Sequence, residues 1–256
     1  MAAPATSPPT LVFLHGFAES REVWTDFTRS FPAHYRLLAP NLPGHGTNRA
    51  PVPDFSMEAQ ARYVAQYLTD KGAADPVLLV AHSMGGYVAL ALAERYPSRV
   101  AGLALINSTA LPDTDEKRLN REKNIGFVER HGVAKFMDSF VRPLFAPANR
   151  DRLAEARELL EEIGKATPAA TFAGALRGMA ARPDRSAVLA RAAFPVLAVA
   201  GKHDVAVPFD DSVRQAALPA TAAALFLEGS GHLAYLEQPD ETRRAVLALA
   251  SAVFGG

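Results

Sequence analysis

A serine at the junction of an apolar run and a helix-like stretch is the first feature of this sequence that could do chemistry. Ser83 lies in Ala81-His82-Ser83-Met84-Gly85-Gly86, a pattern close to the G-x-S-x-G turn between a strand and a helix. Such a turn holds the serine hydroxyl above the sheet edge, and the residues two before and two after the serine must be small. Ala81 and Gly85 meet this requirement, although alanine stands where glycine is usual. The competing interpretation is a serine that only caps a helix.

An aspartate and a histidine further along the chain could turn Ser83 into a nucleophile. A serine hydroxyl needs a general base at neutral pH, and the usual base is a histidine oriented by a carboxylate. Asp204, in the segment GKHD, and His232, in the segment GSGH, each follow an apolar strand-like run, as Ser83 does. Because open α/β sheets place their sites at the carboxyl ends of the strands, we expect these three residues to meet. Taken singly, Asp204 could belong to an Asx-turn and His232 to an ordinary loop.

The loop after the first predicted strand could complete an acyl-transfer site. Such a site needs two backbone N–H groups where the oxyanion forms. We expect one from Met84, the residue after the serine, and the other from Phe17 in His15-Gly16-Phe17. Gly16 is assigned to the geometry of this loop, and we interpret His15 as a structural residue that holds the loop in place.

Short apolar runs alternate with helical patterns along most of the chain. This alternation predicts parallel strands joined by right-handed helical crossovers, and therefore a doubly wound α/β sheet covered on both faces. The predicted strands lie at residues 10–15, 36–40, 76–82, 100–107, 195–200 and 222–227. The clearest helical patterns lie at residues 20–31, 57–68, 84–96, 209–217 and 241–254.

The stretch from Pro112 to Ala192 interrupts this alternation. It contains helical patterns and no convincing strand, and it holds 27 of the chain's 54 charged side chains (27 Lys and Arg plus 27 Asp and Glu). Half of the charge in under a third of the length is typical of thin, well-solvated helices. We therefore predict an α/β core formed by residues 1–110 and 193–256, interrupted by a helical insertion at residues 111–192.

The large apolar side chains of the insertion leave two interpretations open. They could line a substrate pocket, which would favour a substrate with an apolar acyl or aromatic part, or they could form only the core between the helices of the insertion. These residues are Phe127, Phe136, Met137, Phe140, Leu144 and Phe145. Outside the insertion, we expect Trp24, Phe27 and Phe31 to be core residues and not a stacking platform.

The composition excludes several classes of protein. The chain of 256 residues has 27 Lys and Arg against 27 Asp and Glu, and this zero net charge argues against a nucleic-acid partner, which would require a basic excess. Because the chain has no cysteine, it has no disulfide, no thiolate nucleophile and no Cys-ligated metal site. Its histidines form no H-x-x-x-H pair, so we expect neither a metal site nor a cofactor.

The sequence predicts neither a membrane span nor a secretory signal. The N-terminal segment MAAPATSPPT has no Lys or Arg and no apolar run, unlike a secretory signal. The longest uncharged stretch near the middle of the chain, residues 76–93, contains His82, Ser83 and two adjacent glycines, which do not suit the core of a bilayer. We therefore expect a cytoplasmic protein with no membrane partner.

These motifs resemble those of the α/β-hydrolase superfamily, in particular its lidded branch of serine esterases and lactonases. The resemblance rests on the chain order Ser, Asp, His and on the segments LHGF (14–17), LPGHG (42–46), AHSMGG (81–86), GKHD (201–204) and GSGH (229–232). It implies a mainly parallel sheet, and it implies that the insertion is a lid that roofs the pocket and sets substrate choice. Relatives with an aspartate nucleophile, such as haloalkane dehalogenases, are excluded by the serine at position 83.

The leading hypothesis is a cofactor-free serine hydrolase that cleaves a small carboxylic ester or lactone through an acyl-enzyme on Ser83. In this hypothesis His232 is the general base, Asp204 orients His232, and the Phe17 and Met84 amides bind the oxyanion. The resemblance also implies that the same three side chains could serve C–C bond hydrolysis, a lyase reaction of menaquinone synthesis, or perhydrolase chemistry. A less favoured hypothesis, from another class of protein, is a ligand-binding receptor that keeps the triad.

Overall fold

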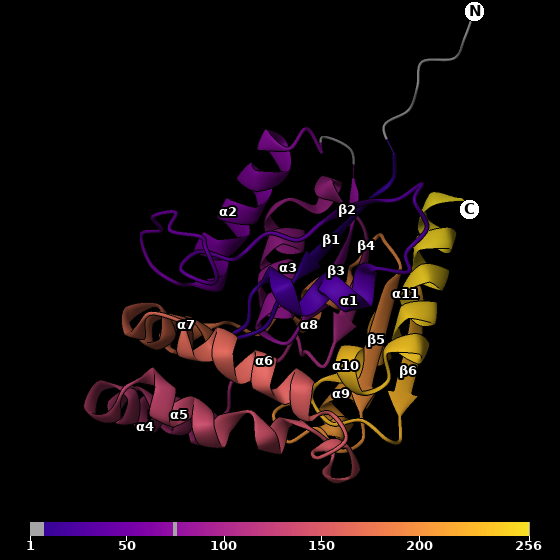
Figure 1. Ribbon diagram of the computed structural model, residues 1–256. Helices are drawn as coiled ribbons and strands as arrows, with labels where there is room; N and C mark the ends of the chain where they lie inside the picture. Colours follow the sequence, from indigo (N-terminus) through magenta and orange to yellow (C-terminus); the bar gives the residue numbers. More distant parts are fainter. Residues whose placement is uncertain (1–7, 74–75, 256) are drawn as a thin grey trace, which may run out of the picture.

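The described residues contain one parallel sheet at the centre of the molecule (Figure 1). In the computed structural model, which describes residues 8–73 and 76–255, the strand order is β2-β1-β3-β4-β5-β6. Every neighbouring pair is parallel. The strands are β1 (Thr10–Leu14), β2 (Arg36–Leu38), β3 (Val77–His82), β4 (Val100–Ile106), β5 (Val196–Gly201) and β6 (Ala222–Leu227). The predicted parallel α/β sheet is confirmed.

The expectation that the chain has no secretory signal concerns mainly residues 1–7, which lie outside the described residues.

The inner strands are apolar on both faces because helices cover both faces of the sheet. All residues of β1, β3 and β5 are buried, which explains why their sequences are continuous apolar runs without polar alternation. The two edge strands are less protected. All three residues of β2 are half-buried, and β6 exposes most of its residues.

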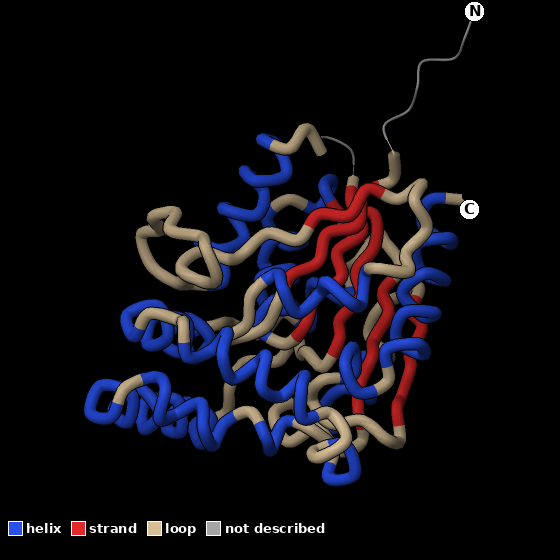
Figure 2. Tube along the Cα trace, in the orientation of Figure 1, coloured by secondary structure: helices blue, strands red, loops and turns tan. Residues whose placement is uncertain are grey.

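Helices α3 and α11 cover opposite faces of the sheet, and Figure 2 shows helices on both sides of the strands. A side chain at Gly102 of β4 would meet Val253 of α11, whereas Leu105, which faces the other way, lies against Gly86 of α3. This arrangement confirms the doubly wound fold. The helices outside the insertion are α1 (Thr25–Thr28), α2 (Met57–Asp70), α3 (Met84–Arg95), α9 (Phe209–Ala216), α10 (Ala234–Glu237) and α11 (Pro239–Phe254).

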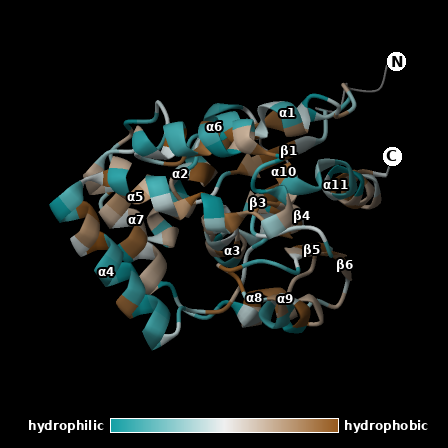
Figure 3. Ribbon diagram, turned by 60° about the horizontal axis from the view of Figure 1, so that its bottom comes forward, coloured by the Kyte–Doolittle hydropathy of each residue, from teal (hydrophilic) through white to brown (hydrophobic). Residues whose placement is uncertain are grey.

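The insertion lies between β4 and β5, and its residues, all of which the structure describes, form helices and turns but no strand. Most of it lies beyond the carboxyl ends of the strands, at the lower left of Figure 1. Helix α4 is hydrophilic along much of its length (Figure 3), and only Ile125 and Val128 in it are buried. The helices are α4 (Asp115–His131), α5 (Val133–Phe140), α6 (Ala154–Lys165), α7 (Ala169–Ala181) and α8 (Ser186–Ala190). Because α8 packs against α3 of the core, the boundary at residue 192 stays a prediction.

The helix predicted at residues 20–31 is replaced by a 3₁₀ turn at Arg21–Trp24, followed by the single turn of α1. The rings of Trp24, Phe27 and Phe31 surround Phe13 of β1, with centroid distances of 5.5, 6.4 and 5.5 Å. Packing around one ring therefore sets the path of this segment and overrides its helical periodicity. The three aromatic residues are core residues, as predicted.

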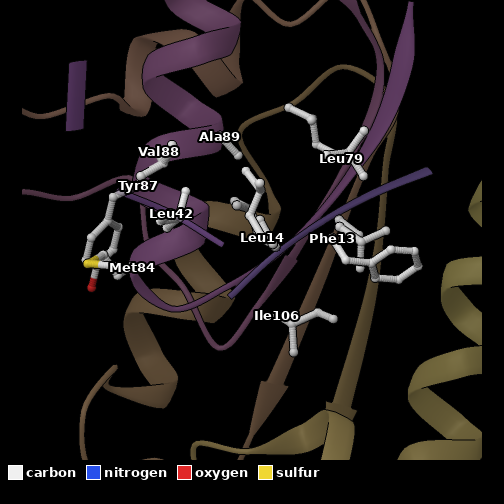
Figure 4. Close-up of a cluster of buried hydrophobic side chains, with 14 of the residues drawn as sticks. Phe13, Leu14, Leu42, Leu79, Met84, Tyr87, Val88, Ala89 and Ile106 are labelled. Atoms are coloured by element: carbon white, nitrogen blue, oxygen red, sulfur yellow. The ribbon is translucent and has the colours of Figure 1, made fainter. Parts of the chain in front are cut away.

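The first turns of α3 are anchored in the core next to Ser83. Figure 4 shows Met84, Val88 and Ala89 of α3 together with Leu14 of β1 and Leu42 of the loop after β2. All five side chains are fully buried. The serine therefore projects from a well-packed base, which limits its movement.

Candidate active site

Ser83 occupies the sharp turn between the end of β3 and the start of α3. Its backbone angles, φ 47° and ψ −115°, lie in a region that residues other than glycine rarely adopt. The residue stands at the N-cap position of α3, but its side chain makes no capping hydrogen bond. The hydroxyl oxygen instead lies 2.9 Å from Nε2 of His232. The geometry therefore rejects the interpretation of Ser83 as a simple helix cap.

The small residues around the serine allow α3 to begin close to the sheet. A Cβ atom at Gly85 would collide with the backbone carbonyls of Leu14 and His15 at the end of β1. Ala81 is fully buried within β3. The requirement for a small residue at position 85 thus comes from the close approach of the neighbouring strand.

His232 bridges Ser83 and Asp204. Its Nδ1 lies 2.9 Å from both carboxylate oxygens of Asp204, and its Nε2 lies 2.9 Å from the Ser83 hydroxyl. Because an ionised carboxylate only accepts hydrogen bonds, Nδ1 carries the proton and Nε2 can accept one from the serine. The backbone N–H of His232 donates to the carbonyl of Leu144 in the insertion at 2.8 Å. The three predicted side chains, from three distant segments, are therefore joined in the order Ser, His, Asp.

Asp204 is held in its ionised form by its surroundings. One carboxylate oxygen accepts the backbone N–H groups of Ala206 (2.8 Å) and Val207 (2.9 Å), and the other accepts the Asn107 amide at 2.9 Å. Burial alone would raise the pKa of Asp204, but the charge of His232 and these hydrogen bonds outweigh burial and lower that pKa below its usual range. His232 therefore faces a carboxylate throughout the neutral pH range.

His15 holds the loop after β1, as its predicted structural role requires. Its Nδ1–H donates to the carbonyl of Gly16 at 2.9 Å, and its Nε2 accepts the backbone N–H of Leu42 at 3.0 Å. Burial lowers the pKa of His15, so the ring is neutral. Gly16 has no room for a side chain, because a Cβ atom there would lie 2.7 Å from Nδ1 of His82. Both residues fix the path of the chain into Phe17.

A cavity between the core and the insertion opens onto Ser83 and His232. Phe17 also lines this cavity, whereas Met84 is fully buried beneath the turn. α3 begins at Met84, so the Met84 N–H is one of the helix's first four amides, which have no carbonyl partner within the helix. The binding of an oxyanion by the Phe17 and Met84 amides stays a prediction.

For the large apolar residues of the insertion, the sequence left open whether they line a pocket or form only the core between the helices. The structure shows that some do each. Some line the cavity, and others pack among the helices. The lining residues are Phe136, Phe140 and Leu144. Met137 and Phe145 are buried in the packing, and Phe127 packs against that core without lining the cavity.

Three residues near the cavity were not assigned from the sequence. Asn107, at the end of β4, donates its amide to Asp204 and to the carbonyl of Gly231, and its φ of 48° is rare for a residue other than glycine. A polar residue at the end of a predicted strand was the signal for it. Glu19, in the loop after β1, is buried, and no feature of the sequence indicated this, because its partners His82 and Tyr235 are remote in the chain. Arg121 lines the cavity from α4, where a dense run of charges gave no signal.

Two further findings concern metals and membranes. Within residues 8–73 and 76–255, no group of three or more His, Cys, Asp or Glu side chains is arranged to hold a metal ion. Among the helices in the described part of the chain, none combines the length and the apolar character needed to cross a bilayer.

Comparison with known proteins shows similarity over almost the whole chain. A family model described as the alpha/beta hydrolase fold matches residues 9–239. The chain is 30% identical over 254 residues to the pimeloyl-[acyl-carrier protein] methyl ester esterase of Xanthomonas oryzae pv. oryzae (strain MAFF 311018), a match that covers 96% of each chain. It is 34% identical over 120 residues to the monoacylglycerol lipase ABHD6 of Bos taurus, which covers 46% of this chain and 36% of that protein.

A solved structure is similar over a comparable length. The thermophilic esterase from Thermogutta terrifontis, solved with malate bound, superposes with a TM-score of 0.90 at 28% sequence identity. The superposition covers 96% of this chain and 90% of the esterase.

Proposed function

The chain belongs to the α/β-hydrolase fold family and is an enzyme of the esterase and hydrolase type; from this premise we propose that it is a cofactor-free serine hydrolase that cleaves a small carboxylic ester or lactone. The observation that carries the proposal is the pair of hydrogen bonds made by His232, one to Ser83 and one to Asp204, each at 2.9 Å. In that arrangement the serine hydroxyl has a base, and the base has a fixed tautomer.

The reaction proceeds in two halves. Ser83 Oγ attacks the carbonyl carbon of the ester while its proton passes to Nε2 of His232, and the Phe17 and Met84 amides stabilise the oxyanion. The alcohol then leaves with the proton from His232, and an acyl group remains on Ser83. In the second half, His232 takes a proton from water and the resulting nucleophile attacks the acyl carbon. The bond to Ser83 Oγ then breaks, the proton on His232 returns to Oγ, and the acid is released.

The cavity supports a substrate with an apolar part. Phe17 from the core and Phe136 and Phe140 from the insertion present aromatic rings to it, and pockets for small molecules are mostly apolar with a few fixed polar groups. We therefore assign to the insertion the role of a lid that selects the acyl or alcohol group, while the core supplies the reacting residues.

Replacement of the nucleophile tests the proposal. Ser83→Ala should lower the turnover of p-nitrophenyl esters by at least about 10⁴-fold while the protein stays folded. Ser98→Ala changes an exposed serine just past the opposite end of α3 from Ser83; it is the matched control and should keep full activity. A fluorophosphonate probe should label Ser83 in the parent protein and in the control. Undiminished ester turnover by Ser83→Ala would refute the proposal.

The chemistry after the first attack is tested by mass. An activated ester should leave an acyl increment on Ser83, and a panel of p-nitrophenyl esters, lactones and thioesters should then define the substrate class. Turnover that depends on Ser83 but leaves no adduct would favour use of the same residues for C–C bond hydrolysis, lyase or perhydrolase chemistry. Retention of a ligand with one turnover or none would favour a receptor.

A further inference from the structure

Glu19 and His82 form a buried contact that the proposed reaction does not use. Nδ1 of His82 lies 3.1 Å from the Glu19 carboxylate, and the two side chains are only 1% and 7% exposed. The other ring nitrogen of His82, Nε2, lies 2.9 Å from the backbone carbonyl of His232. Because a carbonyl oxygen only accepts hydrogen bonds, Nε2 carries a proton.

The partners of Glu19 indicate that the contact is an ion pair. The carboxylate accepts the backbone N–H of Gly16 at 2.6 Å and the hydroxyl of Tyr235 at 3.2 Å. These donors suit an ionised carboxylate, which requires a proton on Nδ1 of His82 as well. Burial alone would raise the pKa of Glu19 and lower the pKa of His82, but their mutual attraction and hydrogen bond outweigh burial, so the pKa of Glu19 is lowered and the pKa of His82 is raised.

This ion pair connects the three segments that carry the candidate catalytic groups. The Glu19 carboxylate accepts the N–H of Gly16, and it thereby holds the loop after β1 that carries Phe17. His82 is itself the residue before Ser83, and its Nε2 holds the backbone of His232. Each of these segments reaches the site from a different strand, and backbone hydrogen bonds within one strand or helix cannot fix their separation.

We propose that Glu19 and His82 are positioning residues, an inference that rests on the proposed function. Their ion pair sets the loop of Phe17 against the loop of His232, so that the Phe17 amide and the His232 imidazole keep their places relative to Ser83. Both side chains belong to the lining of the cavity, but their polar atoms are bonded to each other and to protein groups, so the pair acts by holding the loops and not by binding the substrate. It should therefore affect the transition state, where the oxyanion forms, more than the binding of the ester.

Two substitutions separate the effect of the charge of Glu19 from the effect of the shape of its side chain. Glu19→Ala removes the carboxylate and its contacts, while Glu19→Gln keeps a side chain that can still bond Gly16 and a neutral His82. The matched control is Glu22→Gln, because Glu22 is 44% exposed and forms its ion pair with Arg21 at the surface. We expect kcat to fall about 10- to 100-fold in Glu19→Ala, less in Glu19→Gln and not at all in the control, with KM little changed.

The ring of His82 gives a readout that needs no turnover. In protein with isotope-labelled histidine, the His82 ring should give the spectrum of an imidazolium at neutral pH in the parent protein and of a neutral imidazole in Glu19→Gln. Signal assignment comes from its loss in His82→Gln. A neutral ring in the parent protein would overturn the ion pair, and a kcat for Glu19→Ala equal to that of Glu22→Gln would overturn the positioning role.

The Ser83→Ala variant separates this inference from the proposed function. If Ser83→Ala is inactive and the Glu19 variants behave like the control, the positioning role fails and the serine hydrolase stands. If Ser83→Ala remains active, the proposed function fails, and the ring spectrum of His82 still decides whether the charge pair exists.

Discussion

The carboxyl edge of the sheet and the insertion are held in place by different interactions. At the sheet edge, side chains bond to backbone groups of neighbouring loops, as Asn107 does to the carbonyl of Gly231 and as His15 does to the N–H of Leu42. The buried pair of Glu19 and His82 also bonds to backbone groups there, those of Gly16 and His232. In the insertion, buried charges pair with one another. Asp113 is fully buried and accepts hydrogen bonds from both Arg121 and Arg182.

The two regions therefore tolerate change differently. Bonds to backbone groups define positions closely, which a reaction requires. Pairs between long charged side chains secure the insertion without involving Phe136 and Phe140, the aromatic residues that it presents to the cavity. Phe17 is one of the places where the two regions meet, because its ring lies 4.6 Å from Phe172 and 6.0 Å from Phe140 between ring centroids. We expect changes at the edge to alter the rate of reaction, and changes in the insertion to alter stability or substrate choice.

The largest expected effect comes from Asp204, which belongs to the edge. Asp204→Asn should lower kcat about 10⁴-fold, because an amide cannot hold the tautomer of His232 or stabilise its protonated form. Steady-state kinetics with a p-nitrophenyl ester measures this effect. Asp210→Asn, at the exposed start of α9, is the control and should retain the parent rate. If Asp204→Asn lowered kcat by only tenfold or less, the sheet edge would not have its proposed role in the reaction.

Asp113 tests the insertion in the same way. Asp113→Asn should lower the free energy of unfolding by about 3 kcal/mol, since it leaves two guanidinium groups without a carboxylate partner. Urea unfolding measures the loss. Asp138→Asn removes a carboxylate that is 61% exposed and 2.8 Å from Lys165, and it should cost at most about 1 kcal/mol. If folded Asp113→Asn lost kcat as strongly as Asp204→Asn, the distinction between the two regions would break down.

His45, in the core region, gives a test based on how the free energy of unfolding depends on pH. Burial, with help from His15, lowers the pKa of His45 from 6.5 to about 3. Between these values the unfolded chain binds a proton that the folded protein does not, so acidification reduces the free energy of unfolding, by about 1.4 kcal/mol per pH unit at most. Between pH 6.5 and 5, His45→Asn should show a shallower loss than the parent protein in urea unfolding. The exposed His34→Asn should keep the parent slope, and equal slopes in all three proteins would contradict the expectation.

The smallest expected effect is on substrate choice. Phe140→Ala enlarges the cavity on the side of the insertion, and it should raise kcat/KM for longer acyl chains relative to the acetate ester by about tenfold. Phe127→Ala removes a ring that does not line the cavity and is the matched control. Rates across a series of p-nitrophenyl esters give the comparison. If Phe140→Ala instead lowered kcat/KM equally for every ester, Phe140 would affect the rate of reaction, as the edge residues do, and not substrate choice.

The edge of the sheet was largely predictable from the sequence, because strand ends and turns are local features. Ser83, Asp204 and His232 each follow a short apolar run, and a parallel sheet brings such ends together. Glu19 could not be assigned in this way, since its partners His82 and Tyr235 are remote in the chain. The division of the insertion's aromatic residues was also out of reach, because helical periodicity shows which face is apolar but not what covers it.

One contact between the two regions limits how the roof of the cavity can open. The carbonyl of Leu144 holds the backbone N–H of His232 at 2.8 Å, and next to it Glu237 accepts the N–H groups of both Ala146 and Gly231 at 2.7 Å. If the stretch around Leu144 swung outward, His232, the base of the proposed reaction, would lose this anchor. A movement of the insertion that kept these hydrogen bonds would have to leave residues 144–146 in place.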